Sequence, residues 1–170
     1  MNVLALCGSL RAASMNRMLL EAGARVAAPH RVDIFAGIGA LPLFNPDLEA
    51  DLPAPVRALH AALERADALL IASPEYAHGV TGVLKNALDW LVSFPPFVDT
   101  PVAIFNASPR SVHADAALRE TLVTMSANLV TDACLALPLR GTGPTVDSIV
   151  AAHATSICAA LDRLSHERRE

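Results

Sequence analysis

The feature that most constrains the fold is the apolar run at residues 68–72, which reads Ala-Leu-Leu-Ile-Ala. A strand with apolar residues on both faces must be covered on both sides, so this run predicts a central strand of a buried sheet. The run at 31–35 alternates apolar and polar residues, as a strand exposed on one side does. The expected strands span residues 2–6, 31–35, 68–72, 102–105 and 133–137.

Stretches with helical spacing of apolar residues follow each of these runs. Pro53 and Pro55 stand where the second helix should begin, a position that tolerates proline because first-turn N–H groups lack partners. The third helix is expected over residues 81–93, and Thr145 is expected to cap the last. Residues 37–51 have no period and predict a long surface connection. The expected core positions are Leu20, Gly23 and Ala27, then Val56, Leu59 and Leu63, then Leu84, Leu88 and Leu91, then Leu118, Leu122, Met125 and Leu129, and finally Ile157, Leu161 and Leu164.

This alternation predicts an α/β fold, with a parallel sheet and helices on both faces. Five such units are the number in the flavodoxin-like doubly wound fold, whose strand order is 2-1-3-4-5. The length of 170 residues suits one domain, so we predict a single domain over residues 1–170. In this order the first and third strands are neighbours, and the loops that follow them flank one crevice.

The composition excludes some classes of binding partner. The formal net charge is -4, and no stretch gathers Lys or Arg, which argues against nucleic-acid binding. No apolar run approaches the length of about 20 residues that spans a membrane. The chain enters a strand without a basic, apolar leader, and its three cysteines are far apart, so we expect a cytoplasmic protein with reduced thiols and no zinc site.

The loop at residues 7–16 is the first candidate site. It joins a buried strand to a helix, where backbone N–H groups and the helix dipole favour an anion. Ser9, Ser14 and Asn16 add neutral donors, and the Arg11 guanidinium suits phosphate. The alternative is an ordinary capped connection between strand and helix.

Two further loops carry hydrogen-bonding groups, at residues 73–79 and 106–113. Both follow expected strands, so in the doubly wound order they lie at the same edge of the sheet as the first loop. The coincidence of three polar loops at one edge favours a binding site.

Two motifs in these loops resemble the NADPH-dependent FMN reductase family, which includes related quinone, azo-dye and chromate reductases. The first is Gly-Ser-Leu-Arg at 8–11 with Ser14, Asn16 and Arg17. The second is Pro-Glu-Tyr at 74–76 with Gly79 and Gly82, continued by Leu-Lys-Asn at 84–86 and Asp-Trp at 89–90. The resemblance covers about the first two-thirds of the chain.

The resemblance implies that the first loop holds the phosphate of FMN and that the second cradles the flavin ring, with NADPH or NADH as electron donor. A proline-led turn presents backbone groups edge-on to a flat ring, and Tyr76 offers an apolar body with a polar tip. A flavin needs no protein nucleophile, so no catalytic residue is expected. The implied cofactor-binding residues are Ser9, Arg11, Ser14, Met15, Asn16, Pro74, Glu75, Tyr76, Ala77, His78, Gly79 and Ser108.

The chain departs from the family pattern in two loops. Ala77 stands where the family usually has Asn, so a hydrogen bond near the ring is missing. The third loop is typically Gly-rich after Ser-Pro, whereas Arg-Ser-Val-His follows here at 110–113, so only Ser108 carries over. His78 is either a proton shuttle or simply exposed, and Glu75 either a general acid or the organiser of its own turn.

The function implied is an FMN-dependent NAD(P)H oxidoreductase that passes electrons to flavin, quinone, azo or metal-oxyanion acceptors. A flavin-binding sensor or carrier without turnover is the alternative. A phosphatase is disfavoured, because only three residues separate Cys7 from Arg11, fewer than in low-molecular-weight tyrosine phosphatases. The apolar face around residues 80–91 suggests self-association, and the family is commonly dimeric or tetrameric. Lys85, Asn86 and Asp89 are expected to fix a helix or a subunit contact.

Overall fold

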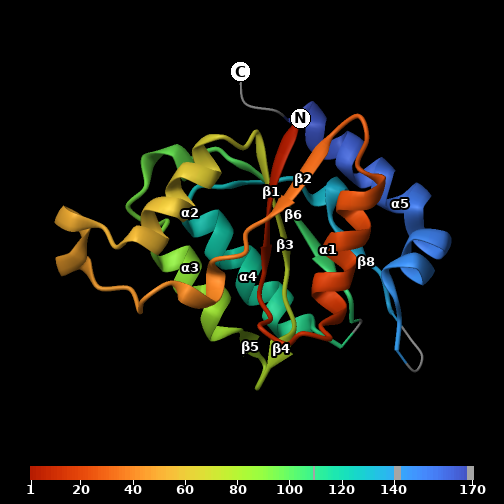
Figure 1. The fold of residues 1–170 in the computed structure, drawn as a ribbon, viewed down its shortest axis with the longest axis horizontal. Helices are drawn as coiled ribbons and strands as arrows, with labels where there is room; N and C mark the ends of the chain where they lie inside the picture. Colours follow the sequence, from red (N-terminus) through yellow and green to blue (C-terminus); the bar gives the residue numbers. More distant parts are fainter. Residues whose placement is uncertain (109, 140–142, 168–170) are drawn as a thin grey trace.

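The computed structural model describes residues 1–108, 110–139 and 143–167. A parallel sheet forms its centre, and helices cover both faces (Figure 1). The strands of this sheet are β1 (Asn2–Cys7), β2 (Arg31–Ile34), β3 (Ala68–Ala72), β6 (Pro101–Asn106), β7 (Asn128–Leu129) and β8 (Leu135–Ala136). The helices are α1 (Met15–Val26), α2 (Ala54–Glu64), α3 (Gly82–Asp89), α4 (Val112–Thr124) and α5 (Val146–His166).

The sheet divides the apolar core into two layers. Helices α1 and α5 pack on one face against Ala5, Leu70 and Phe105. Helices α2, α3 and α4 pack on the other face against Leu4, Leu69 and Ile104. Every residue of β3 is buried, as the run without polar residues predicts for a central strand. The two layers account for the side chains of both faces of the sheet, so the fold is doubly wound.

The strand order is β2-β1-β3-β6-β7, and β8 also pairs with β6. Counting β7 and β8 as one interrupted edge strand, this is the predicted order 2-1-3-4-5 of the flavodoxin-like fold. The expected continuous strand at 133–137 is wrong, because a short 3-10 helix, η4 (Thr131–Ala133), breaks the edge. In the gap, the Ile104 N–H donates to the Cys134 sulfur at 3.3 Å in place of a backbone carbonyl.

Two helix ends also differ from expectation. Helix α3 ends at Asp89 rather than near residue 93, because the following N–H groups of Leu91 and Val92 bond three residues back, which tightens the chain into turns. Leu129 lies in β7 and not in the fourth helix, because α4 ends at Thr124 and Ser126 takes a positive φ of 61°. Helix α5 begins as predicted, with Thr145 and Ser148 forming a capping box.

The segment 37–51 contains two short 3-10 helices, η1 (Ile38–Ala40) and η2 (Pro46–Asp51), and extends away from the sheet (orange to gold in Figure 1). Two side chains hold this segment, one within α3 and one at the end of that helix. The Asn86 side chain accepts from the Phe44 N–H at 2.8 Å and donates to the Pro42 carbonyl at 2.9 Å. The Trp90 indole N–H donates to the same carbonyl at 2.8 Å. This part of the family motif therefore supports the fold.

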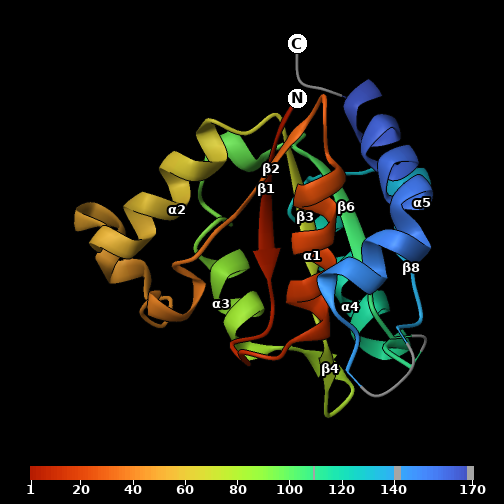
Figure 2. The same ribbon diagram turned by 45° about the vertical axis from the view of Figure 1, so that its right-hand side comes forward.

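The loop after β3 contains a feature that the sequence did not predict. Strands β4 (Glu75–Tyr76) and β5 (Gly79–Val80) form a small antiparallel hairpin, which projects beyond the carboxyl ends of the sheet strands (Figure 2). Its turn residues Ala77 and His78 have φ values of 49° and 59°. Two-residue turns of this kind favour Asn and Gly, because other residues are strained at positive φ.

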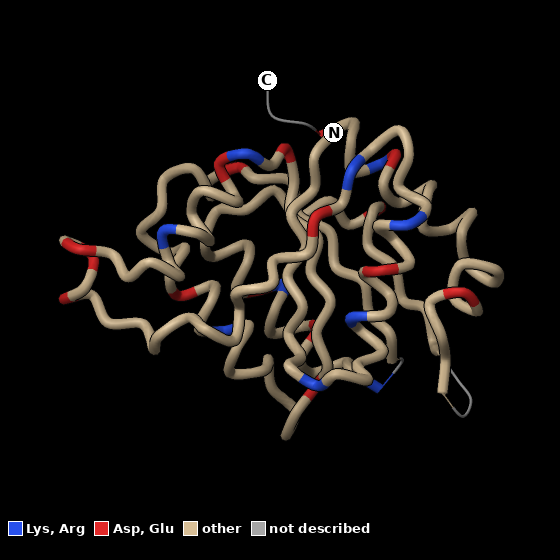
Figure 3. Tube along the Cα trace, viewed as in Figure 1, with Lys and Arg blue, Asp and Glu red and all other residues tan. Residues whose placement is uncertain are grey.

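Charged residues are spread over the fold. In the described part of the chain, Lys and Arg are interspersed with Asp and Glu and form no basic track (Figure 3). No helix among the described residues is long and apolar enough to cross a membrane.

The hydrogen bonds of Asn86 lead to a stability prediction. Asn86→Ala leaves the Phe44 N–H without its partner and removes one of the two donors to the Pro42 carbonyl, so we expect the free energy of unfolding to fall by about 1–3 kcal/mol. Lys85→Ala is the matched control on the same helix, because its ion pair with Asp89 is half-exposed and contributes at most about 0.5 kcal/mol. Urea unfolding of both variants measures the difference. Equal losses would contradict the assigned role of Asn86.

The strained turn leads to a second prediction. Ala77→Gly removes the steric strain that a side chain causes at positive φ, and no hydrogen bond is lost. We therefore expect the hairpin to gain about 1 kcal/mol of stability. Backbone hydrogen exchange at residues 76–80 measures the gain locally. Ala24→Gly, an exposed change within α1, is the control and is expected to destabilise the protein by about 1 kcal/mol.

Candidate functional site

The first and second loops touch at the carboxyl edge of β1 and β3. The Gly8 N–H donates to the Ala72 carbonyl at 2.8 Å. A Cβ on Gly8 would lie 2.1 Å from the Ser73 hydroxyl oxygen and 2.9 Å from the Thr81 hydroxyl oxygen. Only glycine fits between these side chains, so this residue brings the two loops together. The site residues had been expected on either side of such a crevice.

The hydroxyl groups of the first loop are oriented by backbone donors. Ser14 caps α1, and its side chain accepts from the Arg17 N–H at 3.3 Å. The Ser9 hydroxyl accepts from the Arg11 N–H at 3.4 Å. Each oxygen thus accepts from a backbone N–H, which orients the hydroxyl group, and the Ser14 hydroxyl also interacts with the Cys7 sulfur. Both side chains are buried.

Two other polar groups in this loop lack protein partners. The Arg11 guanidinium is exposed and makes no hydrogen bond or ion pair with any residue that the structure describes. Asn16 is 7% exposed, and its side-chain oxygen is buried without a partner. The free cation suits a phosphate, and the unpartnered amide oxygen suits a hydroxyl group of a polyol chain attached to it, because that oxygen can only accept a hydrogen bond. Met15 is the first helical residue and half-exposed.

Cys7 lies beneath this loop. Its thiol is buried and contacts the Ser9 carbonyl at 3.5 Å as a weak donor. Burial raises the pKa of the Cys7 thiol, so the nucleophilic thiolate is disfavoured. A phosphatase would need the opposite shift, and the geometry therefore agrees with the spacing argument against one.

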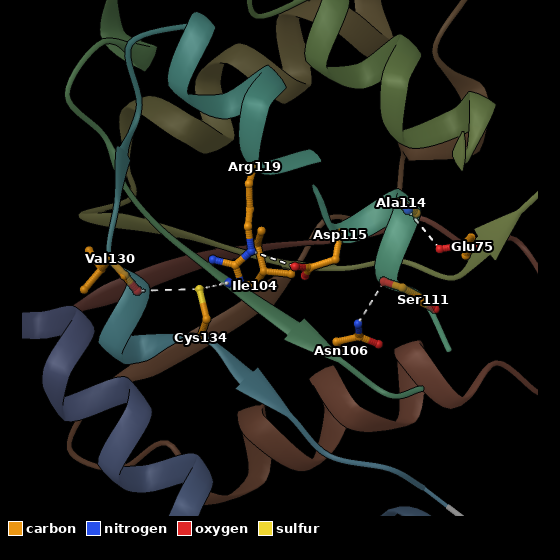
Figure 4. A network of polar contacts seen from close by, with 9 residues as sticks. All are labelled: Glu75, Ile104, Asn106, Ser111, Ala114, Asp115, Arg119, Val130 and Cys134. Atoms are coloured by element: carbon orange, nitrogen blue, oxygen red, sulfur yellow. Dashed lines mark hydrogen bonds and ion pairs between the residues drawn. The ribbon is translucent and has the colours of Figure 1, made fainter. Parts of the chain in front are cut away.

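The second loop holds the β4–β5 hairpin. Pro74 and Glu75 are half-buried, while the Tyr76 side chain is 60% exposed to solvent. Glu75 does not organise its own turn through its side chain. Its carboxylate accepts from the Ala114 N–H of α4 at 2.8 Å (Figure 4). His78 stacks on His113, with ring centroids 4.2 Å apart. The hairpin therefore contacts α4 at two points.

The third loop follows β6. The Asn106 side chain accepts from the Ser108 N–H at 2.8 Å and donates to the Ser111 carbonyl at 3.4 Å, which folds the loop back toward α4 (Figure 4). The Ser108 hydroxyl accepts from the Arg110 N–H at 3.3 Å. Pro109, part of the resemblance, lies outside the described residues.

A narrow cavity connects the second and third loops under the N-terminus of α4. It is lined by Ser73, Val80, Ile104, Asn106, Ser111, Ala114, Asp115 and Leu118. Asp115 of this lining also forms an ion pair with Arg119 at 2.6 Å, and its carboxylate raises the pKa of the Arg119 guanidinium. Arg119 is therefore paired within α4, whereas the Arg11 guanidinium in the first loop has no such partner among the described residues.

The structure brings the predicted residues of the first and second loops to one edge of the sheet. It also shows roles that the sequence did not reveal: the close approach at Gly8, the stacking of His113, and the support that Asn106 gives to the third loop. A polar residue directly after each buried strand was the available signal for Asn106. No local signal pairs His113 with His78, which is 35 positions earlier in the chain.

Comparison with known proteins finds relatives that are named as flavin and quinone reductases. The chain is 39% identical over 127 residues to an NAD(P)H-dependent FMN reductase of Pseudomonas aeruginosa, which covers 71% of this chain and 69% of that protein. It is 46% identical over 83 residues to a 2-hydroxy-1,4-benzoquinone reductase of a Burkholderia species. That match spans 49% of this chain and 45% of the relative.

A solved structure is similar over almost the whole chain. It is a flavoenzyme NAD(P)H:(acceptor) oxidoreductase from Paracoccus denitrificans, with a TM-score of 0.78 and 26% identity over 99% of both chains. The model of the NADPH-dependent FMN reductase family matches residues 1–140, a stretch that contains all three loops. This chain belongs to the NADPH-dependent FMN reductase family.

Proposed function

We propose that this protein is an FMN-dependent NAD(P)H oxidoreductase, built as one FMN-binding domain over residues 1–170. The observation that carries the proposal is the first loop, where the two buried hydroxyls of Ser9 and Ser14 and the free Arg11 guanidinium lie at a helix N-terminus. This donor set fits a dianionic phosphate. Family membership and the names of the relatives support the same activity.

The chain's own residues supply position and electrostatics. Ser9, Arg11, Ser14 and Asn16 would bind the phosphate, with Met15 alongside. The second loop, residues 74–79, would hold the ring through its backbone and the Tyr76 side chain, and Ser108 would border it from the third loop. The bound FMN supplies hydride transfer, so no side chain has to act as a nucleophile.

A quinone is the acceptor class that the surroundings favour. Exposed apolar side chains stand on the elements that border the crevice: Leu10 and Met15 from the first loop, Tyr76 from the hairpin and Val112 from α4. A flat aromatic acceptor gains from apolar contact of this kind. Among the relatives, one is named as a benzoquinone reductase.

We further propose that the protein works in the cytoplasm as a homodimer or homotetramer. The three cysteines are all free, which suits a reducing compartment. The apolar face of α3 is not available for self-association, because Leu84, Ala87 and Leu88 are buried in the core. Leu43 and Val92 are instead 82% and 63% exposed, and support a contact surface near the segment that Asn86 holds.

The freshly purified protein tests the proposed activity. We expect a yellow protein that releases FMN on denaturation and oxidises NADPH repeatedly when benzoquinone is present. The absence of bound flavin, together with no NAD(P)H oxidation when FMN and quinone are added, would overturn the proposal. Rapid reduction of the flavin without repeated turnover would indicate the alternative function, a sensor or carrier.

Arg11 provides a specific test of the phosphate site. Arg11→Ala removes a charged hydrogen-bond donor, so we expect the binding free energy of FMN to weaken by roughly 1.5–3 kcal/mol. Arg25→Ala is the matched control, because it removes the same charge at the far end of α1, where Arg25 pairs with Asp147. Fluorescence titration of the apoprotein gives both constants. Unchanged FMN affinity in Arg11→Ala counts against this site.

A further inference from the structure

Helix α4 begins without a cap of its own. Its N-cap residue is Ser111, whose side chain makes no capping hydrogen bond. The N–H groups of the first turn have no partner within a helix, and the third of them is the one that an N-cap side chain usually satisfies. In α4 this third residue is Ala114.

Glu75 satisfies that N–H from the hairpin. Its carboxylate oxygen accepts from the Ala114 N–H at 2.8 Å, although the two residues are 39 positions apart (Figure 4). A carboxylate at this position also interacts favourably with the helix dipole. Glu75 therefore does for α4 what Thr145 does for α5, but from another element.

The hairpin is small and is joined to α4 by this contact. Each of its strands has two residues, and its turn holds Ala77 and His78 at strained φ values. A hairpin of this size has little stability by itself in water. The Glu75 carboxylate at its base and the stacking of His78 on His113 at its tip both join it to the first turn of α4.

We propose that Glu75 is a positioning residue, whose carboxylate caps α4 and thereby holds the hairpin in the place where the second loop receives the flavin ring. This inference rests on the proposed function. It assigns Glu75 no proton transfer. The side chain acts through the backbone of its own hairpin, which α4 keeps at a fixed height above the sheet.

Riboflavin and FMN together distinguish this role from phosphate binding, since riboflavin has the ring without the phosphate. We expect Glu75→Ala to raise the Kd of both ligands by the same factor, about tenfold. Arg11→Ala should raise the Kd of FMN and leave that of riboflavin unchanged. Glu75→Gln should recover most of the loss, because its amide oxygen still accepts from the Ala114 N–H.

Thr145→Ala is the matched control, because it removes a cap from the equivalent N–H, that of Ser148, on a helix that carries no predicted site residue. It should lower the melting temperature as Glu75→Ala does and leave the Kd of both flavins unchanged. Flavin affinity that stays at the wild-type value in Glu75→Ala, or that falls equally in Thr145→Ala, overturns the proposal.

Hydrogen exchange of the apoprotein tests the positioning role of Glu75 without any need for flavin binding. Glu75→Ala should speed backbone exchange at residues 76–80 and 112–115 by about tenfold and leave β1 and β3 unchanged. Unaltered exchange in the hairpin contradicts the positioning role, whether or not the protein binds flavin. A wild-type protein that binds no flavin, with exchange altered as expected, contradicts only the proposed function.

Discussion

The close approach of Gly8 to Ser73 and Thr81 is the constraint on which the candidate site depends. A single Cβ at Gly8 would stand 2.1 Å from the Ser73 hydroxyl oxygen, so any other residue would push apart the ends of two paired central strands. Because these strands are buried on both faces, they cannot shift to make room. The loop with the free cation and the loop with the hairpin therefore meet at the one place where the strand order reverses.

Much of this could be predicted from the sequence, because the signals are local. The unbroken apolar run of β3, the cap at Thr145, and the prolines that open α2 each act within a few residues. The strand order followed from the number of strand–helix units. Local patterns also placed the first two polar loops at one edge, since parallel strands end together there.

The remaining features depend on contacts between residues far apart in the chain. In the break between β7 and β8, the Cys134 sulfur accepts a hydrogen bond from the Ile104 N–H. The sequence around residue 134 gives no sign of this partner. The hairpin was missed because its turn reads Ala-His, where Asn-Gly would have signalled it. The role of Glu75 could not be predicted either, because its partner is the backbone N–H of Ala114. Every residue except proline has such a group, so the sequence does not mark this one.

The two halves of the candidate site are stabilised in different ways. In the first loop, Ser9 and Ser14 are oriented by neighbouring N–H groups, so a phosphate would meet donors that are already ordered. The hairpin is oriented by side-chain contacts with α4, through Glu75 and His78. A phosphate site built from its own backbone tolerates changes elsewhere in the fold. A ring site held by another helix would respond to them, so substitutions in α4 or the third loop of this protein would change the proposed ring site without altering the proposed phosphate site.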